Sequence, residues 1–226
     1  MQTARIARIV EHHAAVRSFF LEPETPIPFQ AGQFVALSLQ DGGAERSYSI
    51  ANEPDAPLLE LCIALKPEGL MSPALFNLRE GDRVFLSEAR GSFLLPADPV
   101  DVCFICTGTG IAPFRSMLLQ ALKHGDTRTF HLISGNRTRA EALYHEELLT
   151  LAQVYPNLHY HPVLSRESVP GFGHGYVHPL YQQLFADRRD ARFLVCGWTN
   201  MLTDARRNLK EMGYNRRQYF FESYDG

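Results

Sequence analysis

A short glycine-rich segment, Thr107-Gly108-Thr109-Gly110-Ile111-Ala112-Pro113, has the composition of a phosphate-binding turn. It follows an apolar run and precedes a stretch with helical periodicity. Glycine lets the backbone approach a phosphate closely, and a helix N-terminus offers free N–H groups and a positive dipole end. Pro113 suits the first helical turn, although it replaces the third glycine of the common dinucleotide fingerprint. We therefore predict a pyrophosphate site here; a tight strand-to-helix turn without a ligand would use the same residues.

Two single side chains, Cys196 and Arg46, could also take part in chemistry. Cys196 ends an apolar run and is expected at the carboxyl end of a strand, where open α/β sheets collect their ligands. Arg46 carries a planar, permanently charged fork that suits a diphosphate. Taken alone, a buried strand cysteine and a surface arginine are the simpler alternatives.

The remaining cysteines and the histidines do not suggest a redox or metal centre. Cys103 and Cys106 form a C-x-x-C inside an apolar run, where packing is expected, because reactive pairs of this kind usually open a helix. No cysteines stand at iron–sulfur spacing. His159 and His161 would share one strand face, but a catalytic metal site usually needs three protein ligands. We predict no bound metal.

The residues before about Pro96 are expected to form short strands, because strand-like runs alternate with turns that contain proline and glycine. The expected strands are residues 4–12, 16–21, 33–39, 45–50, 59–65 and 83–87, with one short helix at 73–78. Short strands with turn signals favour a closed antiparallel barrel over a parallel sheet. We predict a six-stranded antiparallel β-barrel domain over residues 1–98.

After Pro96 the pattern changes to apolar strands followed by amphipathic helices. The expected strands are residues 102–107, 129–134, 158–164 and 193–196, and the expected helices are 113–124, 141–153 and 200–212. In the first helix, apolar residues repeat at helical spacing up to Gly125. This alternation predicts a doubly wound parallel sheet of about five strands, over residues 99–226.

Motifs along the whole chain resemble those of the ferredoxin–NADP(+) reductase superfamily, which includes cytochrome b5 reductases and oxygenase reductases. In chain order the motifs are Arg46-Ser47-Tyr48-Ser49, similar to R-x-Y-[ST]; Gly69-Leu70-Met71-Ser72, similar to G-x-x-[ST]; the turn at 108–113, similar to G-T-G-I-A-P; Cys196-Gly197-Trp198-Thr199-Asn200-Met201, similar to C-G-x-x-x-M; and Phe221-Glu222-Ser223-Tyr224, similar to an ending in Glu, any residue and an aromatic. The resemblance implies an FAD-binding β-barrel followed by an NAD(P)-binding α/β domain.

The resemblance implies that the barrel domain binds FAD. Arg46 would pair with the flavin pyrophosphate, Tyr48 would lie against the isoalloxazine ring, and Ser49 would place its hydroxyl near flavin N5. The other implied flavin contacts are Ser47, Ile63, Gly69, Leu70, Met71 and Ser72. Without the resemblance, Tyr48 could simply be a core residue, and Ser72 could be a helix N-cap.

For the second domain the resemblance implies a dinucleotide site. Its pyrophosphate contacts would be Thr107, Gly108, Gly110, Ile111, Ala112 and Pro113, and its nicotinamide end would include Cys196, Gly197 and Met201. Cys196 would stand beside nicotinamide C4, with Glu222 and Ser49 nearby. Tyr224 would stack on the flavin and yield to nicotinamide. The resemblance thus assigns Ser49, Cys196, Glu222 and Tyr224 as catalytic residues that act through position and polarity.

The expected choice between NADPH and NADH depends on residues that follow the expected strands 129–134 and 158–164 of the second domain. Ser165-Arg166-Glu167 resembles a family sequence that reads the adenosine 2′-phosphate, and Tyr176 resembles a tyrosine used with it. His174 stands where a lysine is usual, and the segments 135–138, which includes Arg137, and 143–148 resemble NADH-preferring members. We predict NADPH, with NADH as the alternative.

The resemblance implies an FAD-dependent oxidoreductase that passes electrons between NADPH and a one-electron carrier such as ferredoxin or flavodoxin, by hydride transfer between nicotinamide C4 and flavin N5. One alternative is an NADH-dependent reductase for an oxygenase, a cytochrome or free flavin. Another is a non-catalytic flavin-binding electron-transfer subunit; such subunits often carry a cysteine-rich cluster segment near the carboxyl end, which is not found here.

Composition and charge limit the other partners. A formal net charge of −3 does not suggest nucleic acid, and no apolar run is long enough to cross a membrane. The amino terminus shows no signal peptide, so a cytoplasmic protein is expected, as a monomer or weak dimer. Basic residues cluster late in the chain, where a solvated face is expected and a docking surface for an acidic carrier is the alternative: Arg206, Arg207, Lys210, Arg216 and Arg217.

Overall fold

The computed structural model describes residues 1–224 and divides the chain into two compact units. The barrel unit comprises Met1–Leu95 and Ala112–His124, and the nucleotide unit comprises Pro96–Ile111 and the chain from Gly125 onward. The helix over 112–124 therefore groups with the barrel, which the sequence did not predict. The predicted domain boundary at residue 98 stays a prediction. None of the helices formed by residues 1–224 is long and apolar enough to cross a membrane.

The barrel unit is built on one antiparallel sheet of six strands, in the order β4-β3-β6-β1-β2-β5. The strands are β1 (Gln2–His13), β2 (Val16–Pro23), β3 (Phe34–Ser38), β4 (Glu45–Ser49), β5 (Leu59–Ala64) and β6 (Arg83–Leu86). A bridge between Ile50 and Leu61, and a 2.8 Å hydrogen bond from Ala51 N–H to Glu60 C=O, join the two outer strands. The sheet therefore closes, and the predicted antiparallel barrel is confirmed.

The core of the barrel is formed by apolar side chains that alternate along the strands. Ile6, Leu21, Leu37 and Leu61 are fully buried in one cluster. The period of two places these residues on the inner face of the sheet, which leaves polar neighbours outside. Helix α1 (Met71–Phe76) covers part of this cluster and begins two residues earlier than the predicted helix at 73–78.

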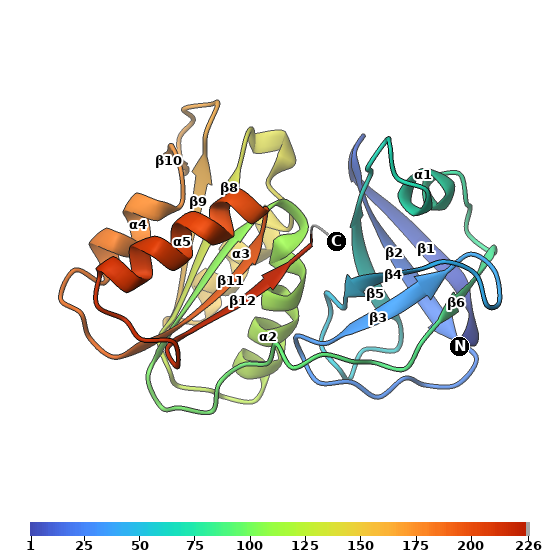
Figure 1. The fold of residues 1–226 in the computed structure, drawn as a ribbon, viewed down its shortest axis with the longest axis horizontal. Helices are drawn as coiled ribbons and strands as arrows, with labels where there is room; N and C mark the ends of the chain where they lie inside the picture. Colours follow the sequence, from blue (N-terminus) through green and yellow to red (C-terminus); the bar gives the residue numbers. More distant parts are fainter. Residues whose placement is uncertain (225–226) are drawn as a thin grey trace. The chain divides into compact units, whose positions relative to one another are not determined.

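The nucleotide unit holds a parallel sheet of six strands, in the order β10-β9-β8-β7-β11-β12. The strands are β7 (Asp101–Thr107), β8 (Phe130–Asn136), β9 (Leu158–Leu164), β10 (Gly173–His174), β11 (Ala191–Gly197) and β12 (Tyr219–Ser223). The helices are α3 (His145–Val154), α4 (His178–Leu184) and α5 (Thr199–Glu211). Two short 3-10 turns are η1 (Gly108–Ile111) and η2 (Arg139–Glu141). Helices α4 and α5 lie on one face of the sheet and α3 on the other (Figure 1). The predicted doubly wound sheet is therefore confirmed.

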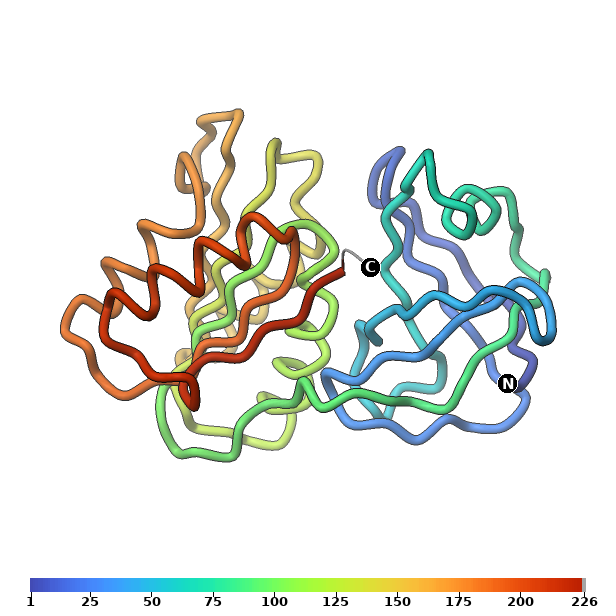
Figure 2. The backbone as a smooth tube through the Cα atoms, viewed as in Figure 1, coloured from blue at the N-terminus to red at the C-terminus, as the bar shows by residue number. Residues whose placement is uncertain are grey.

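Strands β10 and β12 and helix α4 were not predicted. Helix α4 has seven residues and β10 has two, so neither is long enough to show a clear periodicity. Strand β12 pairs with β11 at the edge of the sheet, and the backbone trace shows the chain returning there (Figure 2). Its sequence Tyr-Phe-Phe-Glu-Ser is only half buried, because only one neighbouring strand covers its edge.

Candidate active site

The predicted pyrophosphate turn forms a one-turn 3-10 helix, η1, that runs directly into α2 (Ala112–Lys123). Gly108 adopts φ +54°, a left-handed conformation that favours glycine. Gly110 has no room for a side chain, because an added methyl would lie 2.4 Å from the Cys196 carbonyl oxygen. The structure thus packs the glycine-rich turn against the end of β11, which brings together two motifs separated by more than 80 residues.

Gly197 allows the chain to leave β11 beside this turn. Its φ is +143°, and an added methyl would lie 2.3 Å from the Thr107 hydroxyl oxygen. The same hydroxyl accepts a 3.3 Å hydrogen bond from Trp198 N–H. Met201, on the first turn of α5, is 8% exposed, and its Cε would lie 3.1 Å from that methyl. Each of these residues therefore has a packing role at the carboxyl end of the sheet.

Cys196 and Glu222 are direct neighbours in the parallel register of β11 and β12. Cys196 is fully buried, and burial together with the Glu222 charge raises the pKa of its thiol well above the usual value. A hydrogen bond with the Tyr224 side chain opposes that rise in the pKa. The thiol is therefore neutral at physiological pH, which fits a residue that shapes a site rather than a nucleophile. The structure brings these three predicted residues together.

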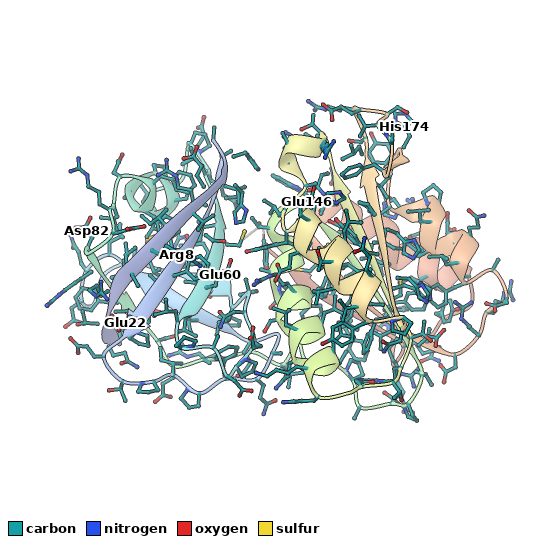
Figure 3. All side chains as sticks on the ribbon, turned by 180° about the vertical axis from the view of Figure 1, so that it is seen from behind. Arg8, Glu22, Glu60, Asp82, Glu146 and His174 are labelled. Atoms are coloured by element: carbon teal, nitrogen blue, oxygen red, sulfur yellow. The ribbon has the colours of Figure 1, made fainter. Side chains whose placement is uncertain are left out.

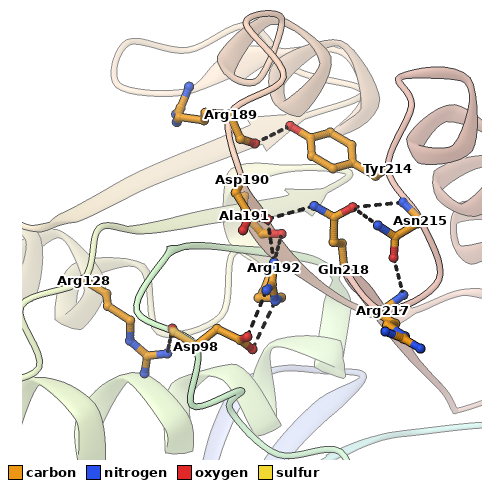
Figure 4. A network of polar contacts seen from close by, with 10 residues as sticks. All are labelled: Asp98, Arg128, Arg189, Asp190, Ala191, Arg192, Tyr214, Asn215, Arg217 and Gln218. Carbon is orange, nitrogen blue, oxygen red and sulfur yellow. Dashed lines mark hydrogen bonds and ion pairs between the residues drawn. The ribbon is translucent and has the colours of Figure 1, made fainter.

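A polar network holds the segment that leads into β12 (Figure 4). Arg192 binds Asp98 at 2.9 Å and Asp190 at 2.7 Å. Gln218 donates to Asp190 at 2.8 Å and accepts from Asn215 at 2.6 Å. Because Gln218 directly precedes β12, this network fixes where the strand begins and therefore the register that places Glu222.

The predicted flavin motif lies on the outer strand β4 of the barrel. Arg46 is exposed and donates from Nη1 to the Glu45 carbonyl at 2.7 Å. Tyr48 packs against the barrel core, and its burial raises the pKa of its hydroxyl to about 12, with the Arg46 charge opposing. Ser49 is 5% exposed, whereas Ser47 is exposed. Tyr48 is thus at least partly a core residue, which was the alternative for this position.

The second predicted flavin motif surrounds the start of α1. Ser72 does not cap the helix: its hydroxyl accepts from Lys66 N–H at 2.8 Å and donates to the Lys66 carbonyl at 3.3 Å. It therefore closes the loop that contains Gly69. Leu70 is 84% exposed, and Met71 is buried. Ile63 is 1% exposed in the barrel core, so its side chain has almost no surface left for a flavin.

The residues predicted to read the adenosine phosphate follow the carboxyl ends of the neighbouring strands β8, β9 and β10. Arg166 N–H donates to the Arg137 carbonyl at 2.9 Å, and Ser165 N–H donates to the Asn136 carbonyl at 3.0 Å. Both arginine side chains are exposed, and Tyr176 is 73% exposed just after β10. The Glu167 carboxylate accepts a hydrogen bond from Arg139 N–H at 2.7 Å, which joins the segment after β9 to the segment after β8. The exposed guanidinium groups of Arg137 and Arg166 and the hydroxyl of Tyr176 are suitable hydrogen-bond donors to a phosphate.

The barrel unit contains a buried ion pair that the sequence did not predict. Arg115 on α2 donates to Glu60 at 2.9 Å and to the Ala51 carbonyl at 2.8 Å. Ser18 donates to the other Glu60 oxygen at 2.7 Å. Figure 3 labels Glu60 within the barrel strands. No local pattern signals such a pair, because its members are 55 positions apart in the sequence.

A group of histidines on the sheet was also only partly predicted. The ring of His131 on β8 stacks on the ring of His159. Nδ1 of His131 lies 3.3 Å from Nε2 of His161. Burial and the neighbouring cations lower the pKa of His131 to about 4. Within residues 1–224, no group of three or more His, Cys, Asp or Glu side chains is arranged to hold a metal ion. The stacking of His131 on His159 and His161 shows that these side chains pack against one another on this face of the sheet.

Comparison with known proteins identifies both units. Residues 5–94 match the model of the oxidoreductase FAD-binding domain, and residues 104–207 match that of the oxidoreductase NAD-binding domain. Ferredoxin–NADP reductase B of Sorangium cellulosum is 31% identical over 87% of this chain and 86% of its own length. The reductase component of phenol 2-monooxygenase of Pseudomonas sp. is 32% identical over 97% of this chain. The chain spans 64% of the length of that relative.

A solved structure agrees with these matches. The ferredoxin NADP+ reductase of Neisseria gonorrhoeae, which was solved with bound FAD and NADP, superimposes with a TM-score of 0.86 and 26% identity over 98% of both chains. Sequence and structure therefore agree over nearly the whole chain. This protein belongs to the ferredoxin–NADP(+) reductase superfamily of flavin oxidoreductases, with an FAD-binding domain followed by an NAD-binding domain.

Proposed function

We propose that this chain is an FAD-dependent reductase that takes electrons from NADPH and passes them singly to a protein carrier such as ferredoxin or flavodoxin. The observation that carries the proposal is the packing of the glycine-rich turn against Cys196, beside Glu222. This packing supports the proposal, because the backbone that would bind a diphosphate lies next to a neutral thiol and a carboxylate at the carboxyl ends of parallel strands.

The residues present fit both cofactors. Gly108 leaves open space beside its backbone, which suits a dinucleotide diphosphate, and Gly110 lets the turn pack closely against the end of β11. In the barrel unit, the exposed Arg46 fork suits the flavin diphosphate, and Ser49 would hold its hydroxyl toward the flavin ring. When bound, FAD supplies an acceptor for a hydride from nicotinamide C4 at its N5 atom, together with stepwise release of the two electrons.

The roles of the protein residues are positional. Cys196 and Glu222 would bound the nicotinamide end of the site, and Tyr224, the last residue of the described chain, would cover the flavin ring until the dinucleotide arrives. The remaining predicted contacts, including Thr107, Ile111, Ala112 and Pro113, would orient the diphosphate. Alignment of nicotinamide C4 with flavin N5 is the main contribution a protein makes to such a transfer.

NADPH is proposed because Ser165 and Arg166 lie directly beside Arg137, with both guanidinium groups exposed, and Tyr176 follows the neighbouring strand β10. The test is anaerobic reduction of the purified flavoprotein by NADPH and by NADH, followed at the flavin absorbance. We expect a kcat/KM at least about tenfold higher for NADPH, since a 2′-phosphate would gain charge-assisted hydrogen bonds from the arginines. A preference for NADH would contradict this choice, and a protein that neither dinucleotide reduces would contradict the enzyme itself.

A second candidate is an NADH-dependent reductase component of an oxygenase. The similarity to the reductase component of phenol 2-monooxygenase favours it. Reduction assays with a panel of ferredoxin, flavodoxin, cytochrome and free flavin separate the two candidates. A turnover with ferredoxin or flavodoxin that greatly exceeds the turnover with free flavin supports the carrier proposal. Reduction of free flavin alone would favour the alternative.

A further inference from the structure

The single tryptophan of the chain, Trp198, lies beside Gly108 of the glycine-rich turn. Its side chain is 58% exposed, among the most exposed large apolar side chains in residues 1–224. Two backbone hydrogen bonds fix its position: its N–H donates to the Thr107 hydroxyl at 3.3 Å, and its C=O accepts from Leu202 N–H at 3.0 Å. An exposed tryptophan on a well-held backbone needs an explanation other than core packing.

Trp198 also conflicts with the local preference of its position. It is the N-cap residue of α5, with φ −66° and ψ 138°, and its side chain makes no capping hydrogen bond. Serine, threonine, aspartate or asparagine would satisfy a helix N–H there, and a tryptophan cannot. Local preferences that a folded protein overrides are concentrated at functional sites.

The indole nitrogen of Trp198 lies near the backbone of the glycine-rich turn. A methyl placed on Gly108 would lie 3.9 Å from Nε1 of Trp198, and no other atom from outside this turn lies within 4 Å of that methyl. The indole N–H can only donate a hydrogen bond. Because Gly108 has no side chain, the space in front of it is open to a ligand, with the indole donor at its border.

We propose that the Trp198 indole N–H donates a hydrogen bond to a diphosphate oxygen of the nicotinamide dinucleotide at the Gly108 turn. This inference rests on the proposed function. The backbone that carries the indole is held in place before the ligand arrives, because it is tied to Thr107 and Leu202. It would add a neutral donor to the helix N–H groups, and a hydrogen bond to a charged oxygen is stronger than one to a neutral group.

The test is Trp198→Phe, which keeps an aromatic ring and removes the donor. Isothermal titration of the oxidised protein with NADP+, NAD+ and ADP-ribose measures the dissociation constants without turnover. We expect binding to weaken about tenfold for each ligand, as for the loss of one hydrogen bond to a charged group. ADP-ribose carries the diphosphate without nicotinamide, so an equal loss there assigns the bond to the diphosphate. Unchanged affinity, or a loss absent with ADP-ribose, overturns the proposal.

Two further variants separate binding from folding. Trp198→Asn introduces a preferred N-cap, so its Tm should equal or exceed that of the wild type while its affinity for ADP-ribose falls. Val154→Ala, which shortens another exposed apolar side chain at 63% exposure, should leave all affinities unchanged. Tighter binding by Trp198→Asn would show that the indole obstructs the site. A wild type that binds none of the ligands would overturn the proposed function as well.

Discussion

Cys196 and Glu222 lie directly opposite each other on the parallel strands β11 and β12. This relationship places a neutral, fully buried thiol and a half-buried carboxylate at the carboxyl edge of the sheet, beside the glycine-rich turn. It depends on β12, which the sequence did not predict as a strand. The polar network around Arg192 and Gln218 secures that strand.

The thiol of Cys196 is expected to matter for alignment of the nicotinamide and not for flavin binding. Cys196→Ala should slow anaerobic flavin reduction by NADPH about ten- to hundredfold, because a small misplacement of reacting groups costs that much. Stopped-flow absorbance measures the rate, and the flavin content of the purified variant measures FAD binding. Cys103→Ala, another fully buried cysteine of the same sheet, is the control and should leave the rate close to wild type. Equal rates for Cys196→Ala and the wild type would refute this role.

Gly110 is expected to tolerate no side chain. Gly110→Ala would bring a methyl within 2.4 Å of the Cys196 carbonyl oxygen, so the turn or the end of β11 must move. We expect the dissociation constant for NADP+ to rise by at least about tenfold, because the displaced backbone N–H groups no longer match the positions of the diphosphate oxygens. Gly171→Ala is a suitable comparison, because Gly171 has open space and a positive φ of +86° away from the turn. Titration calorimetry on both variants would show whether the effect is specific to Gly110.

The buried pair Arg115–Glu60 is expected to stabilise the barrel unit. Arg115→Met leaves the Glu60 carboxylate buried without this cation, and breaking such a pair typically costs about 3–5 kcal/mol. Urea denaturation followed by circular dichroism gives the free energy of unfolding. Glu22→Gln, which breaks the exposed pair with Arg5, should cost less than about 1 kcal/mol. Similar losses for the two variants would show that burial of Arg115–Glu60 has no special importance.

The histidine cluster is expected to make the fold sensitive to acid. The pKa of His131 is lowered to about 4 in the folded state, and that of His161 is also lowered, so the unfolded chain binds more protons between about pH 4 and 6.5. Stability should therefore fall as the pH drops through this window, by an amount on the order of 1–2 kcal/mol at pH 4.5. Urea denaturation at pH 7.0 and at pH 4.5 measures this difference in the free energy of unfolding.

A substitution tests the source of that pH dependence. His131→Phe keeps a ring on the sheet and removes the buried base, so the difference in unfolding free energy between the two pH values should shrink. His124→Gln, at an exposed position beyond α2, should keep the full difference. An unaltered difference in His131→Phe would assign the acid sensitivity to other groups.

Local sequence information determined most of the architecture. Short strand-like runs separated by proline and glycine turns before Pro96 predicted the barrel, and the alternation of apolar strands with amphipathic helices after it predicted the parallel sheet, because local residue patterns reflect the geometry of each element. The glycine-rich turn was recognised for the same reason, since its residues are contiguous. Motif order along the chain then predicted the superfamily.

Tertiary structure decided the relationships between distant residues. The contact of Gly110 with Cys196, the register of Cys196 with Glu222 and the pair Arg115–Glu60 each join segments far apart in the sequence. The position of the Trp198 indole beside Gly108 depends on the path of β11 through Gly197. No local pattern encodes these contacts, because they result from how strands order themselves in a sheet and how helices pack on it.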